Sequence, residues 1–208
     1  QSRSSAASDV YKRQTLLAAA LVMVSGSALA VDGGHIDFNG LVQSGTCKVG
    51  VVDAGMHGIT TDGVVTLDTA NVTDNFAEVN ATAVGLLPKE FMISVNCEPG
   101  KTEASLTMGS ASYANTSGTL NNNMNITVNG IQPAENVNIA VHNMTNKSGA
   151  AEIKQVHMNN SAEKHLLTLD ANGDGQYVFN ASYVKAPNSQ DVTSGHVTTN
   201  ALYTITYN

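Results

Sequence analysis

The sequence predicts an all-β fold, a sandwich or a barrel, on three observations. Short runs of alternating apolar and polar residues recur along the chain, and Gly, Asn, Asp, Ser and Pro separate them. No long window keeps the 3.6-residue apolar period of an amphipathic helix. The 208 residues are 42% hydrophobic and 13% charged, which provides for one well-buried domain and excludes a disordered chain.

Several segments carry the strand pattern, and turns or loops are expected between them. The stretch from Thr69 to Val84 is expected to form a short helix or a loop, and Asn121–Asn123 a loop that leads into the next strand. No Pro-rich or Ser-rich linker divides the chain, so one domain is predicted. The expected strands are His35–Gln43, Gly63–Leu67, Glu90–Val95, Ala104–Met108, Met124–Val128, Val137–Asn143, His165–Leu169, Gln176–Val184 and Val197–Tyr207.

The N-terminal region has the features of an export signal. The apolar run Leu16–Val24 is too short for a helix to cross a bilayer core of about 30 Å, and an A-x-A pattern ending at Ala30 follows it. We therefore expect a non-native or uncertain leader at residues 1–14 and a signal peptide at 15–30. Cleavage is expected after Ala30, with Ala28 as the alternative.

Export changes how the two cysteines are interpreted. Cys47 and Cys97 are the only cysteines, and an oxidising compartment makes a disulfide between them the expected state. Closing a loop of about fifty residues would stabilise the fold by roughly 4 kcal/mol. A reactive Cys remains an alternative that would need a positioned His, while a zinc site lacks the usual CxxC or HxxxH spacing.

The segment Asp170, Asn172, Asp174, Gly175 matches the first half of a calcium-binding loop. The twelfth position of such a loop holds a bidentate Glu, but here it is Ala181, within a strand-like run. Asn, Asp and Gly all tolerate positive φ, so a hairpin turn is the preferred interpretation and calcium the alternative.

The segment from Gly195 to Asn208 predicts an aromatic-rich strand. Val197, Thr199, Ala201, Tyr203, Ile205 and Tyr207 share one face of it. Such a strand at the end of the chain suggests that this end is held or used, which directs attention to assembly rather than catalysis.

Charge and motif content argue against several other classes of protein. The net charge is -7 and no cluster of Lys or Arg occurs, so a nucleic-acid partner is not expected. No nucleophile elbow, phosphate loop or dinucleotide fingerprint is present, so no catalytic residues, no cofactor and no enzyme activity are expected. Six scattered histidines are interpreted as ordinary surface or strand residues rather than metal ligands: His35, His57, His142, His157, His165 and His196.

Three stretches together resemble the major pilin subunits of chaperone-usher fimbriae, especially the type 1 group. The first is VDGGHIDFNGLVQSGTCKV, which leads into Cys47, and the second is FMISVNC, which leads into Cys97. The third is the terminal strand, with Gly195 fourteenth and Tyr207 second from the end, as in the assembly motif of that family. The cysteine spacing is longer than expected for the family and the Asn-rich middle is extended, so loops there need not follow it.

The resemblance implies an incomplete immunoglobulin-like β-sandwich that a donor strand from a partner completes. The groove would lie between the C-terminal strand and the first strand, and a periplasmic chaperone would fill it until the next subunit's extension replaces the chaperone strand. Residues 31–44 would form the donor-strand extension and the start of the first strand, and 45–208 the pilin domain. Gly34, Ile36 and Phe38 are the expected donor residues. The expected acceptor and assembly residues are Gly195, Val197, Ala201, Tyr203, Ile205 and Tyr207.

The leading hypothesis is a structural subunit of a bacterial surface fimbria that supports cell adhesion. Its expected partners are neighbouring pilin subunits, a periplasmic chaperone and an outer-membrane usher, and its expected location is the cell surface after export through the periplasm. A minor or adapter pilin is the alternative within assembly. A secreted, monomeric carbohydrate-binding β-sandwich is the alternative from another class.

Overall fold

The computed structural model describes residues 34–41, 47–53, 62–145 and 153–207. The chain divides at Val31: Gln1–Val31 lies outside the described residues, and Asp32–Asn208 contains every strand. The expected leader and signal therefore lie outside the described residues. Within the described ranges no helix is long and apolar enough to cross a membrane.

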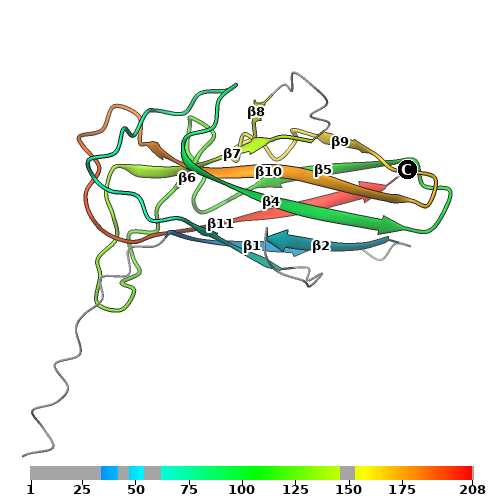
Figure 1. Ribbon diagram of the computed structural model, residues 1–208, viewed down its shortest axis with the longest axis horizontal. Helices are drawn as coiled ribbons and strands as arrows, with labels where there is room; N and C mark the ends of the chain where they lie inside the picture. The colour runs from blue at the N-terminus through cyan, green and yellow to red at the C-terminus, as the bar shows by residue number, and fades with distance from the viewer. Residues whose placement is uncertain (1–33, 42–46, 54–61, 146–152, 208) are drawn as a thin grey trace, which may run out of the picture. The chain divides into compact units, whose positions relative to one another are not determined.

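Eleven strands form two sheets, as the alternating pattern predicts (Figure 1). One sheet has the order β3-β1-β11-β5-β9. The other has the order β2-β4-β10-β7-β6, with β8 paired to β7. The strands of the first sheet are β1 (Gly34–Leu41), β3 (Gly63–Leu67), β5 (Glu103–Gly109), β9 (His165–Thr168) and β11 (Val197–Tyr207). Those of the second are β2 (Cys47–Asp53), β4 (Leu86–Cys97), β6 (Leu120–Asn121), β7 (Val137–Asn143), β8 (Lys154–Gln155) and β10 (Asp174–Lys185).

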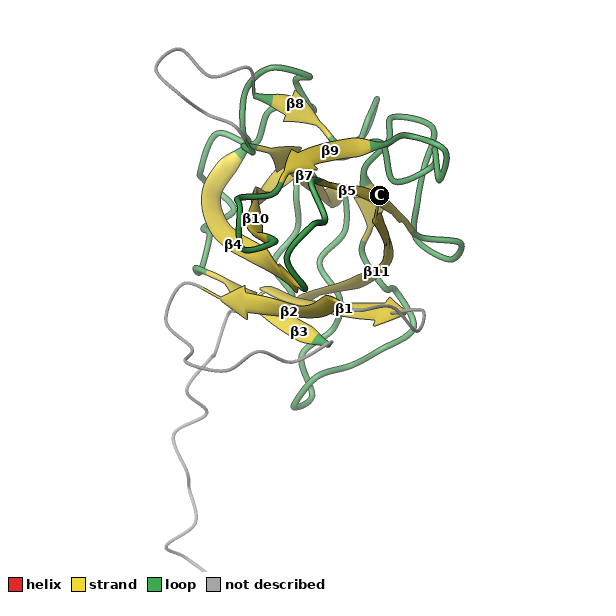
Figure 2. Cartoon of the chain, turned by 90° about the vertical axis from the view of Figure 1, so that its right-hand side faces the viewer, coloured by secondary structure: helices red, strands yellow, loops and turns green. Residues whose placement is uncertain are grey.

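The core lies between the two sheets, and Figure 2 shows the strands arranged around it. In β4 and β10 every second residue is buried, which places Phe91 and Phe179 opposite each other in register with stacked rings 5.4 Å apart. From the other sheet, Leu106 and Tyr203 fill the same core. Alternating burial of this kind is what couples a period-two sequence pattern to one face of a sheet.

The strand predictions are confirmed except at one segment. Met124–Val128 forms no strand: Asn123 uses its side chain to accept a hydrogen bond from the Asn125 backbone N–H at 3.0 Å, and only an isolated bridge joins Val128 to Ile131. The stretch Thr69–Val84 is a loop without a helix. Strands β2, β6 and β8 were not predicted, although the alternating burial of Cys47, Val49 and Val51 is a period-two signal for β2.

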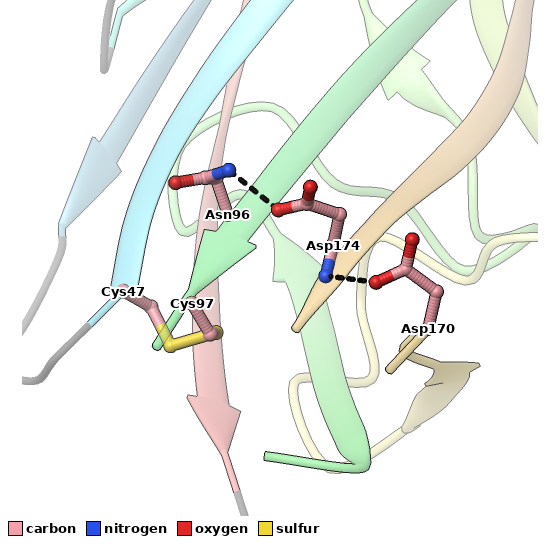
Figure 3. Close-up of a disulfide and its surroundings, with 5 residues drawn as sticks. All are labelled: Cys47, Asn96, Cys97, Asp170 and Asp174. Atoms are coloured by element: carbon pink, nitrogen blue, oxygen red, sulfur yellow. Dashed lines mark hydrogen bonds between the residues drawn. A yellow bond between two sulfur atoms is a disulfide. The ribbon is translucent and has the colours of Figure 1, made fainter. Parts of the chain in front are cut away.

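The predicted turn at Asp170–Gly175 exists, but the hairpin interpretation was wrong. The Asp170 carboxylate accepts hydrogen bonds from the backbone N–H groups of Asn172 and Asp174, at 2.8 and 2.9 Å, and Gly173 has φ +86. The flanking strands β9 and β10 belong to different sheets, so the turn carries the chain from one layer to the other. Figure 3 shows this turn beside the disulfide, with the Asn96 amide bound to the Asp174 carboxylate.

Three of the histidines are buried rather than on the surface. Burial lowers the pKa of His142, although the carbonyl oxygen of Asn80, 2.7 Å from its Nε2, opposes the shift. Burial also lowers the pKa of His165, against an opposing effect of the nearby Glu163 carboxylate. His196 is the third, next to the start of β11. His57 lies outside the described residues.

Candidate strand-binding site

Strand β1 lies in a slot between β3 and β11 of the first sheet (Figures 1 and 2). It runs antiparallel to β3 and parallel to β11, which is the only parallel pairing between named strands of the described chain. The chain therefore completes this sheet with its own N-terminal segment. Without β1, the strands β3 and β11 would both present unpaired backbone groups along the same gap.

The register of β1 sets its even-numbered positions against buried residues on both sides. Ile36 is paired with Thr199 of β11 and Val65 of β3, and both of these side chains are buried. The neighbouring even positions repeat this arrangement. Gly34 is paired with Val197 and Leu67, and Phe38 with Ala201 and Gly63. The three predicted donor residues thus occupy positions opposite the interior face of β11, and their role as donors remains a prediction.

The interior face of β11 consists of the residues that the sequence placed on one side. Val197, Ala201, Tyr203 and Ile205 are buried, and Tyr207 is half-buried. Burial raises the pKa of Tyr203 to about 12, and the nearby Asp62 carboxylate adds to the shift. These side chains belong to the core and to the wall of the slot at once, so any strand in the slot packs on the core itself.

The slot is only partly used by β1. Strand β1 has 8 residues and β11 has 11, and their pairing runs from Gly34 with Val197 to Leu41 with Thr204. In the described pairing, Ile205–Tyr207 lie beyond the last β1 partner. A longer strand that continued past this point would have more of β11 to pair with.

The second wall of the slot corrects the expectation drawn from the resemblance. That expectation named the first strand as the second wall, but β2, the first strand after the extension, pairs with β4 in the other sheet. The wall is β3, through Gly63, Val65 and Leu67. Sequence reasoning missed these residues as site residues, although it predicted the strand, because nothing local shows which strand faces which.

Gly195 lies at the start of β11, where two backbone segments meet closely. A Cβ atom there would overlap the backbone nitrogen of Ala134 and lie 2.5 Å from the carbonyl oxygen of Gln132. The adjacent His196 donates its backbone N–H to that same carbonyl, and its own carbonyl accepts from Ala134, at 3.1 and 2.9 Å. Close backbone approach is therefore the structural reason for a glycine at this position.

Substituting Gly195 with Ala should destabilise the chain by about 1–3 kcal/mol, because backbone rather than a flexible side chain must move to admit the methyl group. Urea denaturation of the variant measures the change. Ser194→Ala, at the exposed neighbouring position, is the matched control and should leave the midpoint almost unchanged. Equal stability of the two variants would contradict the close-approach interpretation.

A cavity of about 310 Å³ opens beside the start of β11. Its floor is apolar, and Thr and Ser side chains contribute to its rim. The apolar residues are Phe76, Ala134, Val137, Tyr183, Val192 and Val197. Since Val197 is the partner of Gly34, the cavity continues the interior of the slot past the first pair of β1.

At the opposite end of β11, a disulfide joins Cys47 to Cys97, which confirms the predicted pairing (Figure 3). The two cysteines are direct partners in the register of β2 and β4. Because β2 is an edge strand with β4 as its only partner, the bond secures the strand that immediately follows the extension and its linker.

These features define a class of protein: an all-β, immunoglobulin-like sandwich in which an extended N-terminal strand completes one sheet. The chain belongs to the fimbrial protein family, whose model matches residues 36–208.

Among solved structures, the chain is similar to the CupB6 tip adhesin from Pseudomonas aeruginosa, with 12% sequence identity and a TM-score of 0.39. The match covers 78% of this chain and 42% of the adhesin chain, so it spans less than half of that protein. No curated protein matches the sequence significantly.

Proposed function

We propose that this chain is the repeating structural subunit of a fimbrial shaft and that it polymerises by donor-strand exchange. Its membership of the fimbrial protein family makes it a fimbrial subunit of the cell surface. The observation that carries the finer proposal is β1 lying between β3 and β11, paired along both edges. A repeating subunit needs both a donor segment and an acceptor slot, and this one chain contains both. Its role is therefore structural rather than catalytic.

Backbone pairing makes the occupant of the slot exchangeable. Ladder hydrogen bonds form between main-chain groups whatever the sequence, and the inward positions decide which strand fits. An extension from a second copy offers the same pattern at Gly34, Ile36 and Phe38. Burying an anchor the size of Ile or Phe contributes roughly 1.5–3 kcal/mol.

The direction of the inserted strand decides which assembly results. Two ends of the sandwich matter: the disulfide end, with Cys47, Cys97 and Tyr207, and the opposite end, where β11 begins at Val197. If a partner's extension entered parallel to β11, as β1 does, its Leu41 would lie near Thr204 and the two disulfide ends would meet. Such an arrangement is reciprocal and closes as a swapped dimer.

Insertion antiparallel to β11 gives a different result. The donor's disulfide end would then meet the Val197 end of the acceptor, a head-to-tail contact that repeats without closing. We therefore propose that filament growth reverses the strand direction in the slot relative to the single chain.

A periplasmic chaperone and an outer-membrane usher are the further partners that we propose. A subunit whose slot is empty exposes the edges of β3 and β11 together with a face of the core, which is an aggregation hazard. A chaperone strand would cover this gap during export, and the usher would bring the next extension to it.

The test supplies the purified chain, residues 31–208, with a synthetic peptide of residues 31–44. The peptide should raise the thermal midpoint slowly, because β1 must leave the slot before the peptide enters, and the β11 amides should then resist hydrogen exchange. A peptide carrying Ile36→Asp and Phe38→Asp is the matched control and should have no effect. A stable monomer indifferent to both peptides would instead favour a secreted binding module.

A second readout uses sheared surface material. Filaments joined by exchanged strands should give ladders on denaturing gels without boiling, and a single band after boiling. A single band under both conditions would count against polymerisation by strand exchange.

A further inference from the structure

Residues Asn123–Gln132 form a projecting hairpin, here called the apolar hairpin. Val128 and Ile131 exchange backbone hydrogen bonds of 3.1 and 2.9 Å across the turn Asn129–Gly130, where φ is 51 and 81. Positive φ at both turn positions is typical of the tight type I′ hairpin. In Figure 1 this light green segment lies at the end of the sandwich away from the labelled C-terminus.

The apolar hairpin exposes the residues that its sequence pattern would bury. Met124, Ile126 and Val128 alternate like the inward face of a strand, yet they are 50%, 41% and 39% exposed. Scattered single apolar residues on a surface are ordinary, but three at alternate positions of one projecting segment form a patch of the kind that marks an interaction surface.

The base of the apolar hairpin is held firmly against the start of β11. The Asn123 backbone N–H donates to the carbonyl of Thr198 at 2.8 Å, and the Asn122 side chain accepts from the Thr198 N–H at 2.8 Å. The Asn122 amide also donates to the carbonyls of Ala134 and His196, at 2.8 and 2.9 Å. Both legs are thus tied to the end of β11 at which the slot begins, so little ordering entropy is lost when the patch is covered.

We propose that the apolar hairpin binds the disulfide end of the neighbouring copy in the filament. This inference rests on the proposed function and on the antiparallel direction of the inserted strand. The donor's residue 41 then lies near Val197, and linker 42–46 leads to its Cys47. The linker spans at most about 20 Å, which keeps the donor's disulfide end within reach of the hairpin base.

Tethering makes a small contact sufficient. The inserted strand holds the two copies at an effective concentration in the millimolar range, so the hairpin contact does not need to bind on its own. Its occupant comprises residues 42–48 and the turn Glu98–Lys101 of the donor copy.

Charge also favours a second copy as the occupant. The chain carries a net charge of -7, so two copies repel each other over most of their surfaces. No charged residue occurs between Glu103 and Glu135, a span that includes the whole apolar hairpin. This projection is therefore a surface that can approach another copy without like-charge repulsion.

The test places a photo-crosslinking amino acid at position 126 of the full mature chain. In assembled filaments it should cross-link to residues 42–48 or 98–101 of a second copy, as mapped by mass spectrometry, and monomers should give no such product. Cross-links confined to one chain, or directed to any other partner or region, would overturn the proposal.

A pair of matched variants tests the contribution to assembly. Met124→Asn combined with Ile126→Asn should slow filament growth roughly tenfold while capture of the 31–44 peptide is unchanged. Leu166→Asn, on β9 and 53% exposed, is the control and should grow normally. Equal growth of both variants would refute the hairpin contact but leave strand exchange standing, whereas failure of the unmodified chain to capture the peptide would refute both.

Discussion

A mature chain that lacks residues 31–41 should lose cooperative folding. The deletion removes β1, and with it eight paired positions along β11 and five along β3. It also uncovers interior residues such as Val65 and Thr199, which β1 separates from solvent. Since domains are stable by only about 5–15 kcal/mol, removing a central strand should consume most of that free energy. Thermal unfolding followed by circular dichroism should show a broad, weak transition or aggregation.

Adding the 31–44 peptide in trans should restore a sharp transition to the shortened chain. The complete chain from residue 31 onward is the reference, and the Ile36→Asp, Phe38→Asp peptide is the matched control that should fail to rescue. Cooperative unfolding of the shortened chain without any peptide would show that the slot can close by itself, and the proposed need for a donor would then be wrong.

Replacing both Cys47 and Cys97 with Ser should lower the free energy of unfolding by roughly 4 kcal/mol, the chain-entropy value for a closed loop of about fifty residues. The bond joins partners directly across β2 and β4 and secures an edge strand. Guanidinium denaturation of the oxidised chain and the double variant measures the difference.

The double variant should also pair β2 less firmly when the extension leaves the slot. Hydrogen exchange should therefore quicken at Val49 and Val51 before it quickens in β10. A variant as stable as the oxidised chain would show that the pairing with β4 is sufficient by itself to hold β2.

Local pattern was enough to predict most strands but not the partners of any. The alternation in β11 predicted its buried face residue by residue, because side chains of a strand point alternately to opposite faces whatever lies beside it. The same alternation at Met124–Val128 predicted a strand that does not exist, since no neighbouring backbone pairs with that segment and the Asn122 and Asn123 side chains shape the loop instead.

The remaining corrections have the same origin. The turn at Asp170–Gly175 was predicted from residues that tolerate positive φ, yet only the sheet order shows that it joins two layers. The second wall of the slot is β3 instead of the first strand, because β2 pairs with β4 across the disulfide.

The sequence by itself determined the all-β class, the single cysteine pair, the interior face of β11 and the resemblance to fimbrial subunits. Only the tertiary structure decided that β1 lies between β3 and β11, that it runs parallel to β11, and that Gly195 meets the backbone of residues 132–134. The physical reason is that the alternation of a strand is set by its own side chains. Pairing, direction and close approach depend instead on main-chain groups that are the same in every strand, so they are settled only when distant segments meet.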